Sequence, residues 1–115
     1  MTERPALEIA TAYLDAFTGK DLEKAGGYLA EDFTLDGPIA HYRSAEEFLA
    51  GATRFAESIR PGWTQIAAFG DEREALLLYD LAVVSGATMR IADHLTVSDG
   101  KIQTETVVWD THGFR

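Results

Sequence analysis

Asp93 is the residue of this sequence whose surroundings most favour acid–base chemistry. It lies in a strand-like run at residues 87–97, where successive side chains point to opposite faces. A carboxylate among apolar neighbours is costly to ionise, so we expect a raised pKa and a neutral acid able to donate to a developing oxyanion. The alternatives are a β-bulge that turns Asp93 to solvent or a purely structural hydrogen bond. The neighbours that share its face are Met89, Ile91, Leu95 and Val97.

Tyr13 is a second donor for such an oxyanion. Apolar residues recur at three- and four-residue spacings over residues 5–17, and they predict a helix with Tyr13 on its inner face. A phenol on that face can donate a hydrogen bond to the same oxyanion. The alternative is a core tyrosine whose hydroxyl has a structural partner.

Three further residues are candidates for moving a proton. Glu105 shares a strand face with Val107 and Trp109, so it lies deep on a pocket wall if these two residues line one, and in solvent if this is the outer face. Asp36 ends a short predicted strand at residues 33–36. His41, in the loop that follows, suits proton transfer near neutral pH, although surface-loop histidines are commonly solvated.

The elements that position these side chains separate along the chain. Helices are predicted at residues 5–17, 21–25 and 44–59, the last with a capping box of Ser44 and Glu47. Strands are predicted at residues 63–69, 73–84, 87–97 and 101–110, and the Asp-Gly pair at residues 99–100 is a hairpin signal. Helices followed by strands indicate one α+β domain over residues 1–115, with helices packed on a curved antiparallel sheet.

The strand at residues 73–84 is apolar on both faces. One face carries Leu77, Tyr79 and Leu81, and the other carries Leu76 and Leu78. Helices cover one side of a sheet only, so a second apolar face predicts a homodimer packed through the sheet. The alternative is a strand wrapped by its own chain.

Composition restricts the classes of partner. The net charge of -9 repels phosphate backbones and anionic lipids, so we expect neither nucleic acid nor a membrane surface as partner. The absence of cysteine excludes disulfides and thiolate sites and suits a reducing, cytoplasmic location. His41, His94 and His112 show no metal-ligand spacing, and there is no Gly-rich phosphate loop, so no metal and no cofactor is predicted.

Five short strings, in this order, give the chain a resemblance to the nuclear transport factor 2-like superfamily, especially its SnoaL-like and steroid isomerase branches. They lie at residues 13–17, 20–23, 29–33, 92–95 and 99–102, with the sequences Tyr-Leu-Asp-Ala-Phe, Lys-Asp-Leu-Glu, Leu-Ala-Glu-Asp-Phe, Ala-Asp-His-Leu and Asp-Gly-Lys-Ile. The resemblance implies a cone-shaped α+β fold, a pocket at its open end near His41, and frequent dimerisation. Members of the superfamily include isomerases, cyclases, hydrolases, dehydratases and proteins that only bind.

The steroid isomerase pattern implies that Tyr13 and Asp93 form an oxyanion hole. The general base of that pattern is an aspartate immediately before a proline, and Gly37 stands there in this chain, before Pro38. Asp36 is one residue earlier and should face the opposite way unless a bulge re-aims it.

The surplus of aromatic residues predicts a mostly apolar ligand pocket. The function expected from it is that of a cofactor-independent isomerase, cyclase or dehydratase acting on a small apolar carbonyl compound. A non-catalytic binding module or a dimerisation module of the same fold is the alternative, and the missing base at Gly37 supports it. The predicted pocket residues are Phe17, Phe33, Phe55, Trp63, Tyr79, Met89, Val107 and Trp109.

Overall fold

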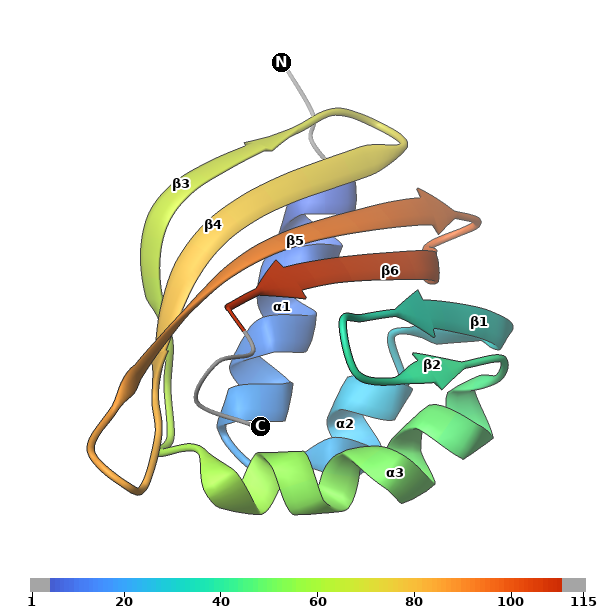
Figure 1. Cartoon of the computed structure of the whole chain (residues 1–115). Coiled ribbons are helices and arrows are strands. Elements are labelled where there is room, and N and C mark those ends of the chain that lie inside the picture. Colours follow the sequence, from blue (N-terminus) through green and yellow to red (C-terminus); the bar gives the residue numbers. More distant parts are fainter. Residues whose placement is uncertain (1–4, 111–115) are drawn as a thin grey trace.

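A six-stranded curved sheet wraps around the first helix of the chain (Figure 1). The computed structural model describes residues 5–110, so His112 lies outside the described residues. The helices are α1 (Pro5–Thr18), α2 (Leu22–Gly26) and α3 (Ala45–Ser58). The strands are β1 (Leu29–Asp36), β2 (His41–Tyr42), β3 (Thr64–Gly70), β4 (Glu74–Ala82), β5 (Thr88–Ser98) and β6 (Lys101–Trp109).

The predicted α+β class is confirmed, and β3 to β6 form the predicted antiparallel meander. The sheet order is β2-β1-β6-β5-β4-β3, and β1 runs parallel to β6 with Thr34 opposite Thr104. The sheet is therefore mixed, where a wholly antiparallel one was expected. No hairpin turn joins β1 to β6, so their relative direction is set by the packing of the whole fold.

Local signals in the sequence account for several element ends. The Ser44 side chain accepts a hydrogen bond of 3.0 Å from the Glu47 backbone N–H, which confirms the predicted start of α3. Lys20 donates from its ammonium to backbone carbonyls at the other end of that helix. Asp99 and Gly100 both adopt positive φ, 53° and 75°, as the tight turn between β5 and β6 requires.

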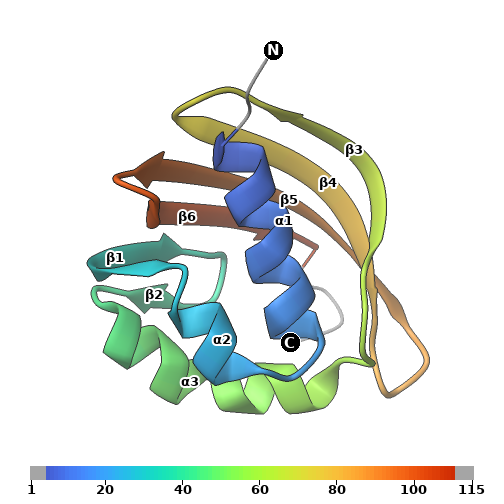
Figure 2. The same cartoon turned by 180° about the vertical axis from the view of Figure 1, so that it is seen from behind.

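The core lies between the concave face of the sheet and α1. In β4 the side chains of Ala75, Leu77, Tyr79 and Leu81 alternate inward, where α1 crosses them (Figure 2). The short helix α2 and the helix α3, which is as long as α1, lie towards the C-terminal end of α1 (Figure 2). No helix within residues 5–110 is long and apolar enough to span a membrane.

Candidate functional site

A cavity of about 260 Å³ lies between α1, α3 and the concave face of the sheet. Its wall is mainly aliphatic and aromatic, and α1, α3 and the strands β1, β2, β4, β5 and β6 all contribute to it. Three polar side chains of the inner wall, Tyr13, Tyr79 and Glu105, line it together. The remaining wall residues most relevant to a ligand are Phe17, Leu35, Ile39, Tyr42, Phe48, Arg54, Phe55, Leu81, Ile91, Val107 and Trp109.

Two buried acids, Glu105 in this wall and Asp93 beside it, are neighbours in the sheet. Asp93 of β5 pairs with Val107 of β6, and Glu105 pairs with Leu95, so the two carboxyls are diagonal neighbours on the inner face of the sheet. Asp93 is fully buried and Glu105 is 4% exposed. Glu105 faces the cavity, whereas Asp93 does not belong to its lining.

Each acid accepts a hydrogen bond from a different tyrosine. The Tyr13 hydroxyl donates to Glu105 Oε1 over 2.8 Å, and the Tyr79 hydroxyl donates to Asp93 Oδ2 over 2.8 Å. Asp93 Oδ1 is buried without a donor when both acids are ionised. A protonated carboxyl is a donor, and Glu105 is the acidic neighbour of Asp93 that can accept from it.

The electrostatics of the pair favour a proton on Asp93. Burial, followed by the charge of Glu105, raises the pKa of Asp93 well above that of a free aspartate. Burial also raises the pKa of Glu105. The pKa values of Tyr13 and Tyr79 are raised well above that of a free phenol, chiefly by burial, so both stay protonated donors. The pKa of Asp93 is raised the more strongly, so Glu105, at the cavity wall, is the acid of the pair that ionises first.

The partners differ from those expected. Glu105 lies on the inner wall and not in solvent, because the inner face of β6 is the one that carries Val107 and Trp109 against the cavity. Tyr13 binds Glu105 directly, and Tyr79 is the phenol that binds Asp93. The sequence did contain this signal, since Tyr79 and Asp93 stand diagonally across the β4–β5 hairpin.

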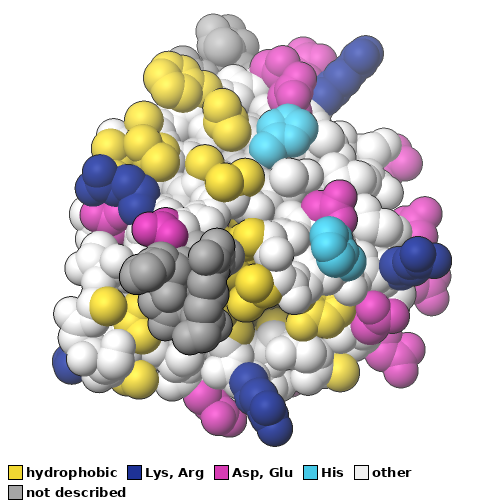
Figure 3. Space-filling model, viewed as in Figure 1, with side chains coloured by type: hydrophobic (Ala, Val, Ile, Leu, Met, Phe, Trp, Pro, Cys, Tyr) yellow, Lys and Arg dark blue, Asp and Glu magenta, His cyan; other side chains and the backbone are white. Residues whose placement is uncertain are grey.

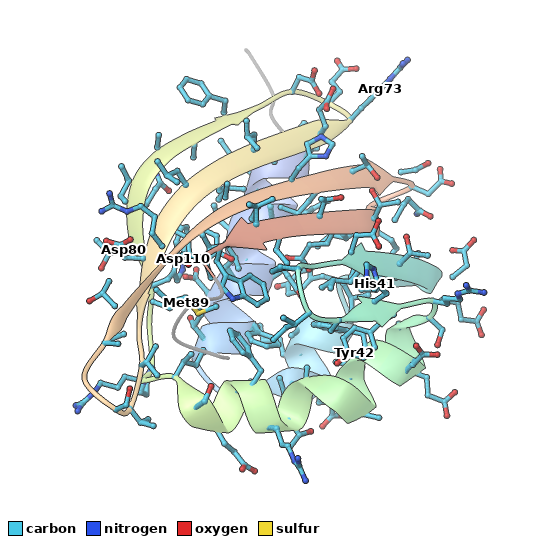
Figure 4. All side chains as sticks on the ribbon, in the orientation of Figure 1. His41, Tyr42, Arg73, Asp80, Met89 and Asp110 are labelled. Atoms are coloured by element: carbon cyan, nitrogen blue, oxygen red, sulfur yellow. The ribbon has the colours of Figure 1, made fainter. Side chains whose placement is uncertain are left out.

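The structure places Asp36 and His41, the other two candidates for moving the proton, away from the cavity. Both lie at the exposed side of the β1–β2 hairpin, where His41 Nδ1 and Asp36 Oδ1 are 2.6 Å apart, and neither lines the cavity. Alternation along β1 points Leu35 inward and Asp36 outward, with no bulge at that point to re-aim it. Tyr42, beside His41, lies between the hairpin and α3 and does line the cavity (Figure 4).

Five of the eight predicted pocket residues line the cavity: Phe17, Phe55, Tyr79, Val107 and Trp109. The other three are Phe33, Trp63 and Met89. Phe33 is fully buried against Phe48, with ring centroids 5.4 Å apart. Trp63 packs edge-on behind Tyr79 and donates its indole N–H to Asp15 over 2.7 Å. Met89 is buried in the core beside the cavity.

The part of the cavity wall that α3 presents was not predictable from local patterns. Tyr42 reaches the cavity because Gly51 leaves room for its ring: a Cβ at Gly51 would lie 2.4 Å from the Tyr42 hydroxyl oxygen. Arg54 precedes Phe55 on α3, and no periodicity distinguishes it from a solvated arginine. No group of three or more His, Asp or Glu side chains within residues 5–110 has the geometry to hold a metal ion.

Comparisons with known proteins place this geometry in a context. A model of the SnoaL-like domain matches residues 10–105. A solved structure from Kribbella flavida DSM 17836 is 34% identical, with a TM-score of 0.88 over 95% of this chain and 89% of that one. An NTF2-like protein of unknown function from Cytophaga hutchinsonii is 18% identical, with a TM-score of 0.84 over 98% and 96% of the two chains.

A second Kribbella flavida structure, provisionally named a ketosteroid isomerase, is 23% identical, with a TM-score of 0.77 over 96% of this chain and 82% of that one. These last two likenesses concern the fold alone. No curated protein matches this chain.

Proposed function

Since this chain belongs to the SnoaL-like domain family of the nuclear transport factor 2-like superfamily, we propose that its cavity binds a small apolar carbonyl compound and moves a proton on it without a cofactor. The reaction class is that of an isomerase, cyclase or dehydratase. The observation that carries the proposal is Glu105, a buried carboxylate on an otherwise apolar cavity wall, with the Tyr13 hydroxyl bound to it.

The contacts support a specific order of events. The ionised Glu105 carboxylate takes a proton from the carbon next to the substrate carbonyl. Once Glu105 is neutral, it is a poorer acceptor, so the Tyr13 O–H can turn to the developing oxyanion. Asp93 does not touch the cavity, so its part is to orient Glu105 and to hold the proton between the two acids.

The experiment uses 2-tetralone, an enolisable ketone of two fused rings. An apolar cavity of roughly 150 Å³ holds a benzene ring, so 260 Å³ admits two fused rings. Incubated in D₂O, the protein should replace the α-protons of 2-tetralone with deuterium faster than buffer alone, as NMR would record. Exchange no faster than in buffer, at a protein concentration that binds the ketone, would count against catalysis.

A non-catalytic binding module is the second candidate. The observation in its favour is Gly37, which places no side chain where the steroid isomerase pattern has its base. Binding of 2-tetralone with no exchange would support this reading. Exchange that depends on Glu105 would exclude it.

A homodimer through the outer face of the sheet is a further part of the proposal. Five side chains on that face form the outer patch: Phe69, Leu76, Leu78, Ala92 and Val108. Phe69 pairs with Leu76, Leu78 with Ala92, and Ala92 with Val108, so they are contiguous across four strands. Phe69, Leu76 and Val108 are 69%, 50% and 61% exposed, and hydrophobic side chains gather over β3 and β4 in Figure 3.

Leu76→Lys should convert the dimer to a monomer. A lysine in the middle of the outer patch leaves a charge to be buried in the interface, and its effect is read as molar mass by light scattering after size exclusion. Ala50→Lys, on the exposed side of α3, makes the same change of charge away from the patch and should remain dimeric. A wild-type protein that is monomeric when loaded on the column at about 100 µM would contradict the dimer.

Composition supports the remaining partner assignments. The net charge of -9 argues against nucleic acids and anionic membrane surfaces. The lack of cysteine suits a reducing compartment such as the cytoplasm.

A further inference from the structure

Arg54 gives the cavity a positive group on the wall opposite the acids. It lies on α3, whereas Glu105 lies on β6 across the cavity. Arg54 is the one cationic side chain in the described lining. It is exposed, as a side chain at the rim of the cavity is, while Glu105 is almost completely buried.

Two cations outside the cavity, Arg90 and Lys20, are engaged by the protein itself. Arg90 forms a two-pronged ion pair with Asp80, and Lys20 donates to the carbonyls that end α3. Arg54 forms no ion pair or side-chain hydrogen bond with any of the described residues. Its guanidinium therefore has donors available for a bound molecule.

The charges of Glu105 and Arg54 determine the orientation of a ligand bound in the cavity. An ionised acid at the deep wall repels an anion, and the guanidinium at the rim attracts one. A ligand with an apolar body, a carbonyl at one end and an anion at the other is thus held with its carbonyl towards Glu105. A planar guanidinium matches a carboxylate in shape as well as in charge.

We propose that Arg54 binds a carboxylate of the ligand, so that the natural ligands are small apolar carbonyl compounds that also carry a carboxylate. This inference rests on the proposed carbonyl site at Glu105, but binding alone can test it. A different role is open to Arg54, because the aliphatic stem of an arginine can simply cover apolar wall.

The test compares 2-naphthylacetate with 2-naphthylacetamide, which have the same shape and differ in charge. Calorimetric titration of the wild-type protein should show tighter binding of the carboxylate. Arg54→Met keeps an aliphatic stem and should weaken binding of the carboxylate by about fivefold or more, while leaving the amide unchanged. Arg54→Lys should keep part of the preference for the carboxylate, and added salt should reduce it.

Arg43→Met is the matched control, since Arg43 is exposed, lies just before α3 and does not line the cavity. It removes the same charge and should change neither titration. If Arg54→Met weakened binding of the carboxylate and the amide equally, Arg54 would only cover apolar wall and the inference would be wrong. Equal affinity of the wild-type protein for the two compounds would also overturn the inference. A preference that depends on Arg54, together with no exchange of 2-tetralone, would keep this inference and reject the catalytic proposal.

Discussion

Glu105→Gln should lower the rate of α-proton exchange by about two to four orders of magnitude, because the variant removes the base at the cavity wall. Glutamine preserves the shape of the side chain and still accepts the hydrogen bond from Tyr13, so binding of 2-tetralone should persist. Initial exchange rates measured by NMR at equal occupancy of the site separate loss of chemistry from loss of binding.

Two variants sharpen this result. Glu57→Gln changes the same residue type at an exposed position of α3 outside the cavity lining and should exchange at the wild-type rate. Tyr13→Phe removes the oxyanion donor and should lower the rate less than Glu105→Gln, by about tenfold to a thousandfold. A Glu105→Gln protein that binds the ketone and retains the full rate would exclude Glu105 as the base.

The buried acid pair should also make the protein less stable as the pH rises. Burial raises the pKa of Asp93, so between the ordinary carboxyl pKa of about 4 and its raised value the folded protein holds a proton that the unfolded chain has lost. The contribution of this proton to stability is complete below about pH 4 and is lost as the pH rises through the raised pKa. One such proton gives a slope of at most about 1.4 kcal/mol per pH unit.

Asp93→Asn should flatten that dependence. The asparagine oxygen can accept the hydrogen bond from Tyr79, its amide can donate to Glu105, and it carries no proton to lose. Urea unfolding at pH values from about 5 to 9 should therefore show that the free energy of unfolding of the variant increases relative to that of the wild-type protein as the pH rises. Asp32→Asn, an exposed strand position, makes the same change of charge and controls for the net charge of -9. Parallel curves for Asp93→Asn and wild type would mean that Asp93 keeps no extra proton on folding.

The sequence predicted the fold well where local rules decide. Capping at Ser44, the Asp-Gly turn at residues 99–100 and the alternation of β4 and β5 each depend on neighbours within a few positions. The parallel pairing of β1 with β6 joins segments about seventy residues apart, and nothing local specifies it.

The sequence allowed us to predict which strand faces could be buried at the site, but not which side chains hydrogen-bond to each other there. Alternation places Asp93 inward, yet whether Glu105 is inward depends on which face of β6 the helices cover, which is a tertiary matter. The same limit applies to the Tyr13–Glu105 and Tyr79–Asp93 pairs, which cross between elements. The Arg54 position has no sequence signal at all, because an arginine beside an apolar stripe of a helix is ordinarily solvated.

The mixed pairing of the sheet fixes when the site can exist during synthesis of the chain. The β4–β5 hairpin holds Asp93 and Tyr79, so this half of the acid network depends on neighbouring strands alone. Glu105 belongs to β6, which is synthesised after the β4–β5 hairpin, and β6 must pair with β1, made long before it, to complete the sheet. In a nascent chain that ends before residue 101, Asp93 therefore has no Glu105 beside it, and the cavity lacks the wall that β6 supplies. The complete acid network can therefore form only after β6 has been made and has paired with β1.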